Sequence, residues 1–245
     1  MPEPSKGSRV PKAAHSLLKR EVLKLLETED LPTVKEKILS FPPRKVINPL
    51  IGALCHREEA VRWKAVAAIG VVVARIAAED LERARVVIRR FMWMLNEESG
   101  GMAWGVPEAM AESLANSRAL AEEYTSILIS YGWEEGNFLE YPPAQRGVVW
   151  GVGRLAQVFP DLLKKFRAPE YLLPLSSSED PFVRAFWVWS YGQMGKEVLG
   201  ELLPEVRRRL QEMPPLELSL LFYDGTDLRK TSFQEILTET LLRLS

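Results

Sequence analysis

The chain has 245 residues, of which 47% are hydrophobic and 27% are charged, and its formal net charge is -1. A chain of this composition can bury a sizeable core. Its balanced charge gives no basic excess that would indicate nucleic-acid binding and no acidic excess that would indicate a disordered tail. The single cysteine, Cys55, excludes a disulfide framework and fits a reducing compartment.

The amino-terminal segment shows no signal for membrane targeting. Residues 1–12 contain prolines and basic residues without an apolar stretch, so we expect no signal peptide and a disordered segment. The most apolar run, Ala65 to Ala74, is much shorter than the ~20 residues that a membrane span requires. These patterns predict a cytoplasmic protein without membrane contact.

From residue 13 the sequence is typical of helices. Apolar residues recur at helical spacing, and prolines mark breaks between short helices. Residues 44–56 and 58–79 are expected to pair with a turn at Arg57. The second of these helices is rich in Ala, Gly and Val around an apolar stripe, so it should lie centrally. We predict one helical repeat domain over residues 13–212.

Residues 213–245 have a different pattern. Residues 216–223 alternate in β-favouring character, residues 226–232 follow, and the Asp224-Gly225 pair between them is a strong hairpin signal. Phe233 to Leu244 again has helical spacing. The segment predicts a short β-hairpin and a capping helix, with the hairpin covering the open end of the array, because the ends of a solenoid need caps.

A repeat runs through the helical part. A Val-Arg pair, Val61-Arg62 or Val183-Arg184, twice begins a helix in which a glycine follows the arginine by eight residues, and Arg146 is followed by a glycine after seven. The spacing between these arginines leaves room for one more unit near residue 104, where Trp104-Gly105 opens a further helix. The resulting period of roughly 40 residues matches HEAT or armadillo repeats.

The units resemble HEAT repeats, specifically the HEAT-like repeats of phycobilisome lyases, over roughly residues 40–200. The matching text includes Pro49-Leu50, Val61-Arg62 and Ile69-Gly70, and later Asp180 and Val183-Arg184. The resemblance implies an all-α, right-handed α-solenoid of about four to five helix pairs. It also implies a ladder of acidic residues and arginines between stacked repeats at Arg62, Arg146 and Arg184, with Arg62, Asp180 and Arg184 as the structural candidates. The alternative is that the three arginines line a ligand groove.

The segment from residue 97 to 108 is the least repeat-like. Glu98 and Ser99 precede a Gly-Gly pair that allows close backbone approach, and Trp104 follows it. Glu108 and Glu112 are four residues apart and therefore share one helix face. Two interpretations remain open here, a binding site with the loop as its rim, or a long turn with a solvated acidic edge.

A second group of candidates lies one repeat later. Arg146, Trp150 and Arg154 are spaced by four residues and share a helix face, which we expect to meet Glu108 and Glu112 in a concave groove. The alternative is a set of inter-repeat ion pairs around a core tryptophan.

The tryptophans recur at a fixed place in the repeat. Trp63, Trp104, Trp150 and Trp187 each belong to the second helix of a unit. Recurrence of this kind usually reflects core packing. The alternative is a groove lined with tryptophan, and in that interpretation Trp187 is one of the groove candidates.

No motif for metal or nucleophile chemistry is visible. The two histidines lie on different expected helices, Cys55-His56 has no partner at ligand spacing, and no Gly-x-Ser-x-Gly elbow occurs. We therefore expect neither a metal nor a cofactor.

Three functions fit the sequence. The first is a non-catalytic adaptor or scaffold that binds a protein or peptide on the concave face of the solenoid. The second, implied by the resemblance to bilin lyases, is a cofactor-handling or lyase-like enzyme. The third, from a resemblance to HEAT-like alkylpurine DNA glycosylases, is DNA binding or base repair. Nucleic acid is not expected, because phosphate neutralisation dominates such binding and the charge here is balanced.

Overall fold

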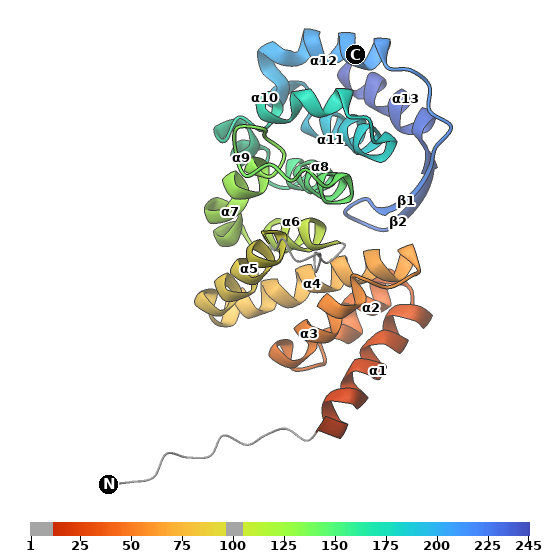
Figure 1. Ribbon diagram of the computed structural model, residues 1–245. Helices are drawn as coiled ribbons and strands as arrows, with labels where there is room; N and C mark the ends of the chain where they lie inside the picture. Colours follow the sequence, from red (N-terminus) through yellow and green to blue (C-terminus); the bar gives the residue numbers. More distant parts are fainter. Residues whose placement is uncertain (1–11, 97–104) are drawn as a thin grey trace.

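The computed structural model describes residues 12–96 and 105–245, which form a stack of helices that rises from the amino terminus to the carboxyl terminus (Figure 1). The expected disordered segment, residues 1–12, therefore lies outside the described residues except for Lys12. The helices of the first half are α1 (Lys12–Thr28), α2 (Leu31–Ile38), α3 (Pro43–Ala53), α4 (Glu59–Glu79), α5 (Leu81–Leu95) and α6 (Val106–Ala115). Those of the second half are α7 (Arg118–Ser130), α8 (Pro142–Ala156), α9 (Pro160–Lys165), α10 (Ala168–Leu172), α11 (Pro181–Leu199), α12 (Leu203–Glu212) and α13 (Phe233–Leu244).

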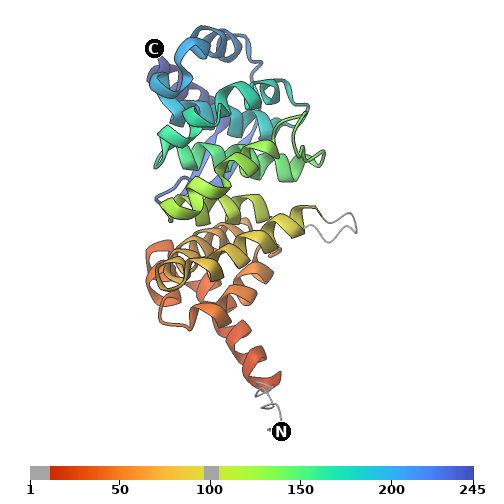
Figure 2. The same ribbon diagram turned by 90° about the vertical axis from the view of Figure 1, so that its left-hand side faces the viewer.

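The helices form two layers. The inner layer consists of α4, α6, α8 and α11, each packed against the next, and α13 continues the row beyond α11. Figure 1 shows α5, α7 and α9 on the opposite side, and Figure 2 shows that outer layer facing the viewer. The expected all-α solenoid of repeated helix pairs, followed by a hairpin and a helix, is confirmed.

Local sequence signals explain where the inner helices begin. Asp180 is the N-cap of α11, and its side chain accepts hydrogen bonds from the backbone N–H groups of Phe182 (2.9 Å) and Val183 (3.0 Å). Helices α6, α8 and α11 each have proline within their first two positions. The N–H groups there have no acceptor within the helix, so proline, which lacks an N–H, costs no helical hydrogen bond. Helices α4 and α11 are apolar on nearly all sides, because they pack between neighbours in the inner layer.

One glycine sets the close approach of two inner helices. A Cβ atom at Gly151 of α8 would lie 2.5 Å from the Cβ of Ala111 in α6. Any larger side chain at position 151 would therefore push the two helices apart, so the small residue is required by the packing.

The β-hairpin forms where the sequence predicts it. Strand β1 (Ser219–Tyr223) pairs antiparallel with β2 (Leu228–Ser232), with Leu221 opposite Lys230. Gly225 in the connecting turn has a φ of 104°, a conformation that glycine adopts without strain. The Asp224 carboxylate accepts hydrogen bonds from the Thr226 and Asp227 N–H groups and so stabilises the turn.

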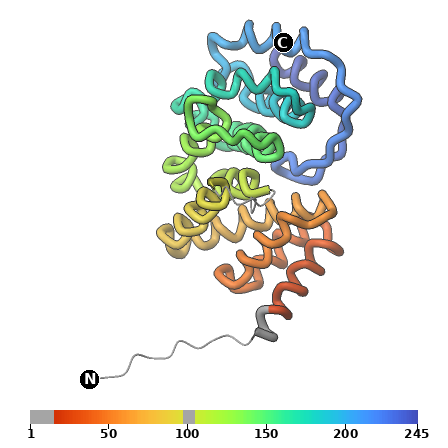
Figure 3. The backbone as a smooth tube through the Cα atoms, in the orientation of Figure 1, coloured from red at the N-terminus to blue at the C-terminus, as the bar shows by residue number. Residues whose placement is uncertain are grey.

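The hairpin lies across the inner face, not at the end of the array, which corrects the expected position. The indole of Trp63 in α4 donates to the Leu221 carbonyl (2.9 Å), and that of Trp150 in α8 donates to the Tyr223 carbonyl (2.7 Å). In Figure 3 the hairpin returns from the blue end of the chain towards the orange helices. The end of the inner layer is covered instead by α13, which packs against α11 and begins with a capping box of Ser232 and Glu235.

Replacing Trp150 by phenylalanine should loosen the hairpin. The change leaves the Tyr223 carbonyl without its indole donor, and an unsatisfied buried carbonyl costs about 1–3 kcal/mol. We expect faster amide hydrogen exchange in β1 and β2. Trp187→Phe is the matched control, because Trp187 is equally buried but donates to Leu172 and not to the hairpin. Equal exchange rates in the two variants would contradict the role given to Trp150.

Within residues 12–96 and 105–245, none of the helices combines the length and the apolar character that crossing a bilayer demands.

Candidate functional site

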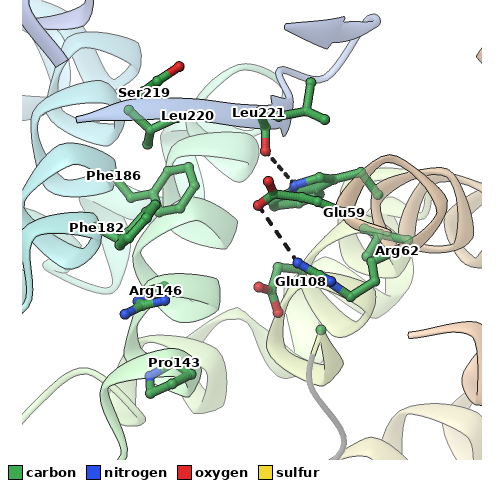
Figure 4. A pocket seen from close by; sticks show the side chains of 13 residues that line it. Glu59, Arg62, Glu108, Pro143, Arg146, Phe182, Phe186, Ser219, Leu220 and Leu221 are labelled. Carbon is green, nitrogen blue, oxygen red and sulfur yellow. Dashed lines mark hydrogen bonds and ion pairs between the residues drawn. The ribbon is translucent and has the colours of Figure 1, made fainter. Parts of the chain in front are cut away.

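A cavity of about 280 Å³ opens on the inner face, where the first turns of the four inner helices meet β1 (Figure 4). Figure 4 shows Glu59, Arg62 and Glu108 on one side, with Arg146, Phe182 and Phe186 on the other and the strand across the top. The residues that line it are Glu59, Arg62, Trp63, Val66, Gly105, Glu108, Pro143, Arg146, Phe182, Phe186, Ser219, Leu220 and Leu221.

One carboxylate oxygen of Glu108, Oε2, is buried without a hydrogen-bond donor among the described residues. The carboxylate lies flat against α8, since a Cβ atom at Gly147 would come within 2.3 Å of Oε2. Burial raises the pKa of Glu108 to about 7, although Arg62 and Arg146 oppose the shift. The cavity wall therefore carries an acceptor that changes charge near neutral pH.

The two guanidinium groups of the cavity are already engaged. Arg146 forms an ion pair with Asp180 of the next unit, with Nε to Oδ1 at 3.0 Å, and its guanidinium lies 4.4 Å from the centre of the Phe182 ring. Arg62 donates to the carbonyls of His56 (3.0 Å) and Arg57 (3.2 Å) in the turn before α4. Neither arginine forms an ion pair with Glu108 among the described residues.

Of the ladder positions Arg62, Arg146 and Arg184, only Arg146 pairs with an acidic residue of the next unit among the described residues. Its partner is Asp180, one of the expected structural residues. Arg184 donates to the Ser178 carbonyl six residues upstream, just as Arg62 donates to that of His56. Because each of these two side chains bends back to the turn before its own helix, it clamps that turn instead of linking neighbouring repeats.

Aromatic side chains form the apolar wall of the cavity. The Trp63 ring lies 4.9 Å from the Trp150 ring and 6.4 Å from that of Phe186, measured between centroids. Trp63 and Phe186 are almost wholly buried, and Ser219 at the mouth of the cavity is exposed. The cavity thus combines a rigid aromatic wall with charged groups, a typical lining for a binding pocket.

Glu112 and Arg154 form a separate, buried ion pair. Arg154 Nε donates to Glu112 Oε2 at 2.7 Å, and the two residues are 8% and 1% exposed. Asn116 donates to the same carboxylate at 2.7 Å. Burial raises the pKa of Glu112 even though Arg154 opposes the shift. The pair is enclosed between α6 and α8 and does not line the cavity.

The hairpin covers this buried pair. The Tyr223 hydroxyl accepts a hydrogen bond from Lys35 of α2 (2.7 Å) and donates one to the Gly225 carbonyl (2.6 Å). Gln157, the residue that follows α8, donates to the Asp224 carbonyl (2.8 Å). The hairpin therefore covers the Glu112–Arg154 pair and is held over it by polar contacts. We infer that the pair stabilises the fold and is not a binding site.

The groove candidates consequently divide into groups. Glu108 and Arg146 both line the cavity, whereas Glu112 and Arg154 form a buried ion pair. Trp150 is fully buried beside Trp63. Trp187 is away from the groove, because its indole donates to Leu172 and its ring stacks on Tyr191. Three further candidates lie outside the described residues: Glu98, Ser99 and Trp104.

Sequence reasoning missed several residues of this face. Glu59, Phe182 and Phe186 line the cavity because they occupy the first two turns of inner helices, and their position in the repeat could have identified them. Lys35 and Tyr223 come together only because the hairpin folds back over the helices, and no local spacing predicts that contact. In the part of the chain that is described, no three His, Cys, Asp or Glu side chains gather as metal ligands would.

Comparisons with known proteins support the repeat architecture. No protein-family model matches the chain. An uncharacterized protein of Archaeoglobus fulgidus is 26% identical over 194 residues, which cover 78% of this chain and 93% of that protein.

Among solved structures, the chain is similar to designed repeat proteins. One designed armadillo repeat protein superposes with a TM-score of 0.58 at 16% identity, covering 98% of this chain and 96% of that one. Another, in complex with the peptide (KR)4, gives 0.55 at 16% identity, with 97% and 96% covered. A computationally designed armadillo repeat protein for modular peptide recognition gives 0.51 at 14% identity, with 96% and 95% covered. At such identities the likeness concerns the fold alone, which is an armadillo-like helical repeat.

Proposed function

We propose that the protein is a non-catalytic scaffold that binds an extended segment of a partner protein in the inner-face cavity. The main observation behind this proposal is that the inner face binds the backbone of the protein's own hairpin. Trp63 and Trp150 donate their indole N–H groups to main-chain carbonyls of β1, two residues apart on one edge of an extended strand. A face that recognises the backbone of an extended strand can recognise a second such segment beside it.

The surroundings of the cavity support a peptide ligand. It is open to solvent next to the edge of β1, and its size suits one side chain better than a large cofactor. Structural neighbours at TM-scores above 0.5 include a designed armadillo protein in complex with a peptide and one made for peptide recognition. We further propose, on the sequence resemblance alone, that the repeats are HEAT-like repeats of the phycobilisome-lyase type.

Panning a phage-displayed library of random peptides against the immobilised full chain tests the proposal. The affinity of the selected peptides is then measured by fluorescence polarisation. Glu59→Trp should weaken binding about tenfold or more, because the indole fills the mouth of the cavity from an exposed position in the first turn of α4, beside the cavity in Figure 4.

The matched control is Lys230→Trp, which places the same side chain at an exposed position on β2, outside the cavity. Failure to select any peptide, or selected peptides that bind both variants equally, would refute the proposal. A labelled DNA duplex serves in the same assay to test the DNA-binding alternative, and saturable binding at physiological salt would favour that alternative.

A further inference from the structure

The charges around the cavity leave one group uncompensated. Asp180 neutralises Arg146, and the Arg62 guanidinium is held by two turn carbonyls with Glu59 at 3.8 Å. Glu108 has neither an ion pair nor, at Oε2, a hydrogen bond within the described residues. Three carboxyl groups therefore accompany two guanidinium groups, and Glu108 is the one of the three that forms no ion pair among the described residues.

The position of Glu108 is preset by the backbone of the neighbouring helix. Its carboxylate packs into the space that a side chain at residue 147 would occupy, so Gly147 allows the carboxylate to lie against α8. A preorganised acceptor loses little conformational entropy when a donor binds, and a charged donor in a partly dry cleft forms a strong hydrogen bond. Glu108 is thus suited to hold a cationic group.

The aromatic wall suits the stem and the charge of such a ligand. Trp63 and Phe186 provide apolar surface in the same cavity as the two carboxyl groups. The cavity already contains one guanidinium on an aromatic face, that of Arg146 over Phe182. A second guanidinium or ammonium group can use Trp63 or Phe186 in the same way.

We propose that the cavity recognises a basic side chain, arginine or lysine, of the bound segment, with Glu108 as its acceptor and the Trp63–Phe186 wall around its stem. This inference rests on the proposed function, since it names the side chain that the inner face selects. Glu59 at the rim provides a second acidic group.

Two pentapeptides test whether the cavity selects a basic side chain. Both have the sequence acetyl-Ala-Ala-Xaa-Ala-Ala-amide, and Xaa is arginine in one and citrulline, the neutral isostere of arginine, in the other. Binding to the full chain is followed by the NMR signal of the Trp63 indole N–H, which borders the cavity. We expect the arginine peptide to bind at least about tenfold more tightly. Glu108→Gln should abolish the difference, whereas Glu122→Gln, which removes an exposed carboxylate of α7, should preserve it.

The possible outcomes distinguish the basic-side-chain inference from the proposed scaffold function. Equal affinity of the two peptides, or no binding of either by a chain that does bind library-selected peptides, would overturn the basic-side-chain inference and leave the scaffold function standing. A chain that selects no library peptide and binds neither pentapeptide would overturn both.

Discussion

Replacing Arg154 by methionine is expected to lower the free energy of unfolding by about 3–5 kcal/mol at neutral pH. The change leaves the Glu112 carboxylate, which is 1% exposed, with two donors, Asn116 at 2.7 Å and the Tyr223 hydroxyl at 3.5 Å. For a chain of this size the melting temperature should fall by roughly 6–20 °C. The loss should grow from pH 5 to pH 8, because the carboxyl without its guanidinium takes up a proton at low pH and so avoids a buried charge.

A double variant provides the control. Glu112→Leu combined with Arg154→Met removes both charges and should recover most of the lost stability, since buried ion pairs can be replaced by apolar residues at little cost. Urea denaturation of the three proteins measures the effect. If Arg154→Met were as stable as the parent chain, the pair would contribute nothing to folding and the structural role given to it would be wrong.

Glu108 lies one helical turn before Glu112. Replacing Glu108 by glutamine is expected to raise the free energy of unfolding at neutral to basic pH. The pKa of Glu108 is about 7 in the folded chain, against an ordinary value of 4.5, because burial disfavours its charge. The folded state therefore binds this proton more tightly than the unfolded state. Ionisation of Glu108 thus lowers stability progressively from about pH 4.5 to pH 7, and the penalty is complete above pH 7, where it reaches about 2–3 kcal/mol.

Glutamine cannot ionise, so Glu108→Gln should stabilise the chain at pH 8 by up to that amount and leave it nearly unchanged at pH 4.5. The charged groups that face Glu108 are Glu59 and Arg62 from α4 and Arg146 from α8, and all of them remain in the variant. Thermal denaturation at the two pH values, with Glu122→Gln as control, measures the difference. A variant that is less stable at pH 8 would show that Arg62 and Arg146 depend on this carboxylate.

The helical repeat and the hairpin could be predicted from the sequence because each depends on residue patterns within a short segment. The Arg-to-Gly spacing of the second helices and the Asp224-Gly225 turn identified the repeat and the hairpin. The path of the hairpin could not be predicted, because Trp63 and Trp150 look like ordinary core residues until their indole N–H groups meet β1.

The candidate site was predicted in part for a similar reason. Helical spacing places Glu108 and Glu112 on one face of α6, but it does not say which neighbour each one meets. Gly147 leaves room for Glu108 beside α8, while Arg154 reaches Glu112 further along the same helix. Two carboxylates that look equivalent in the sequence therefore have different environments, one in a cavity and one in a closed ion pair.

The hairpin also changes how the array should unfold. In a simple solenoid each repeat contacts only its neighbours, so one end can unfold while the other stays native. Here the hairpin joins Lys35 to Tyr223 across 188 residues and Trp63 to Leu221 across 158. Loss of the first helices would release the strand that also contacts Trp150 and Gln157 in the second half. The two halves are thus thermodynamically coupled, and the chain should melt in one cooperative transition.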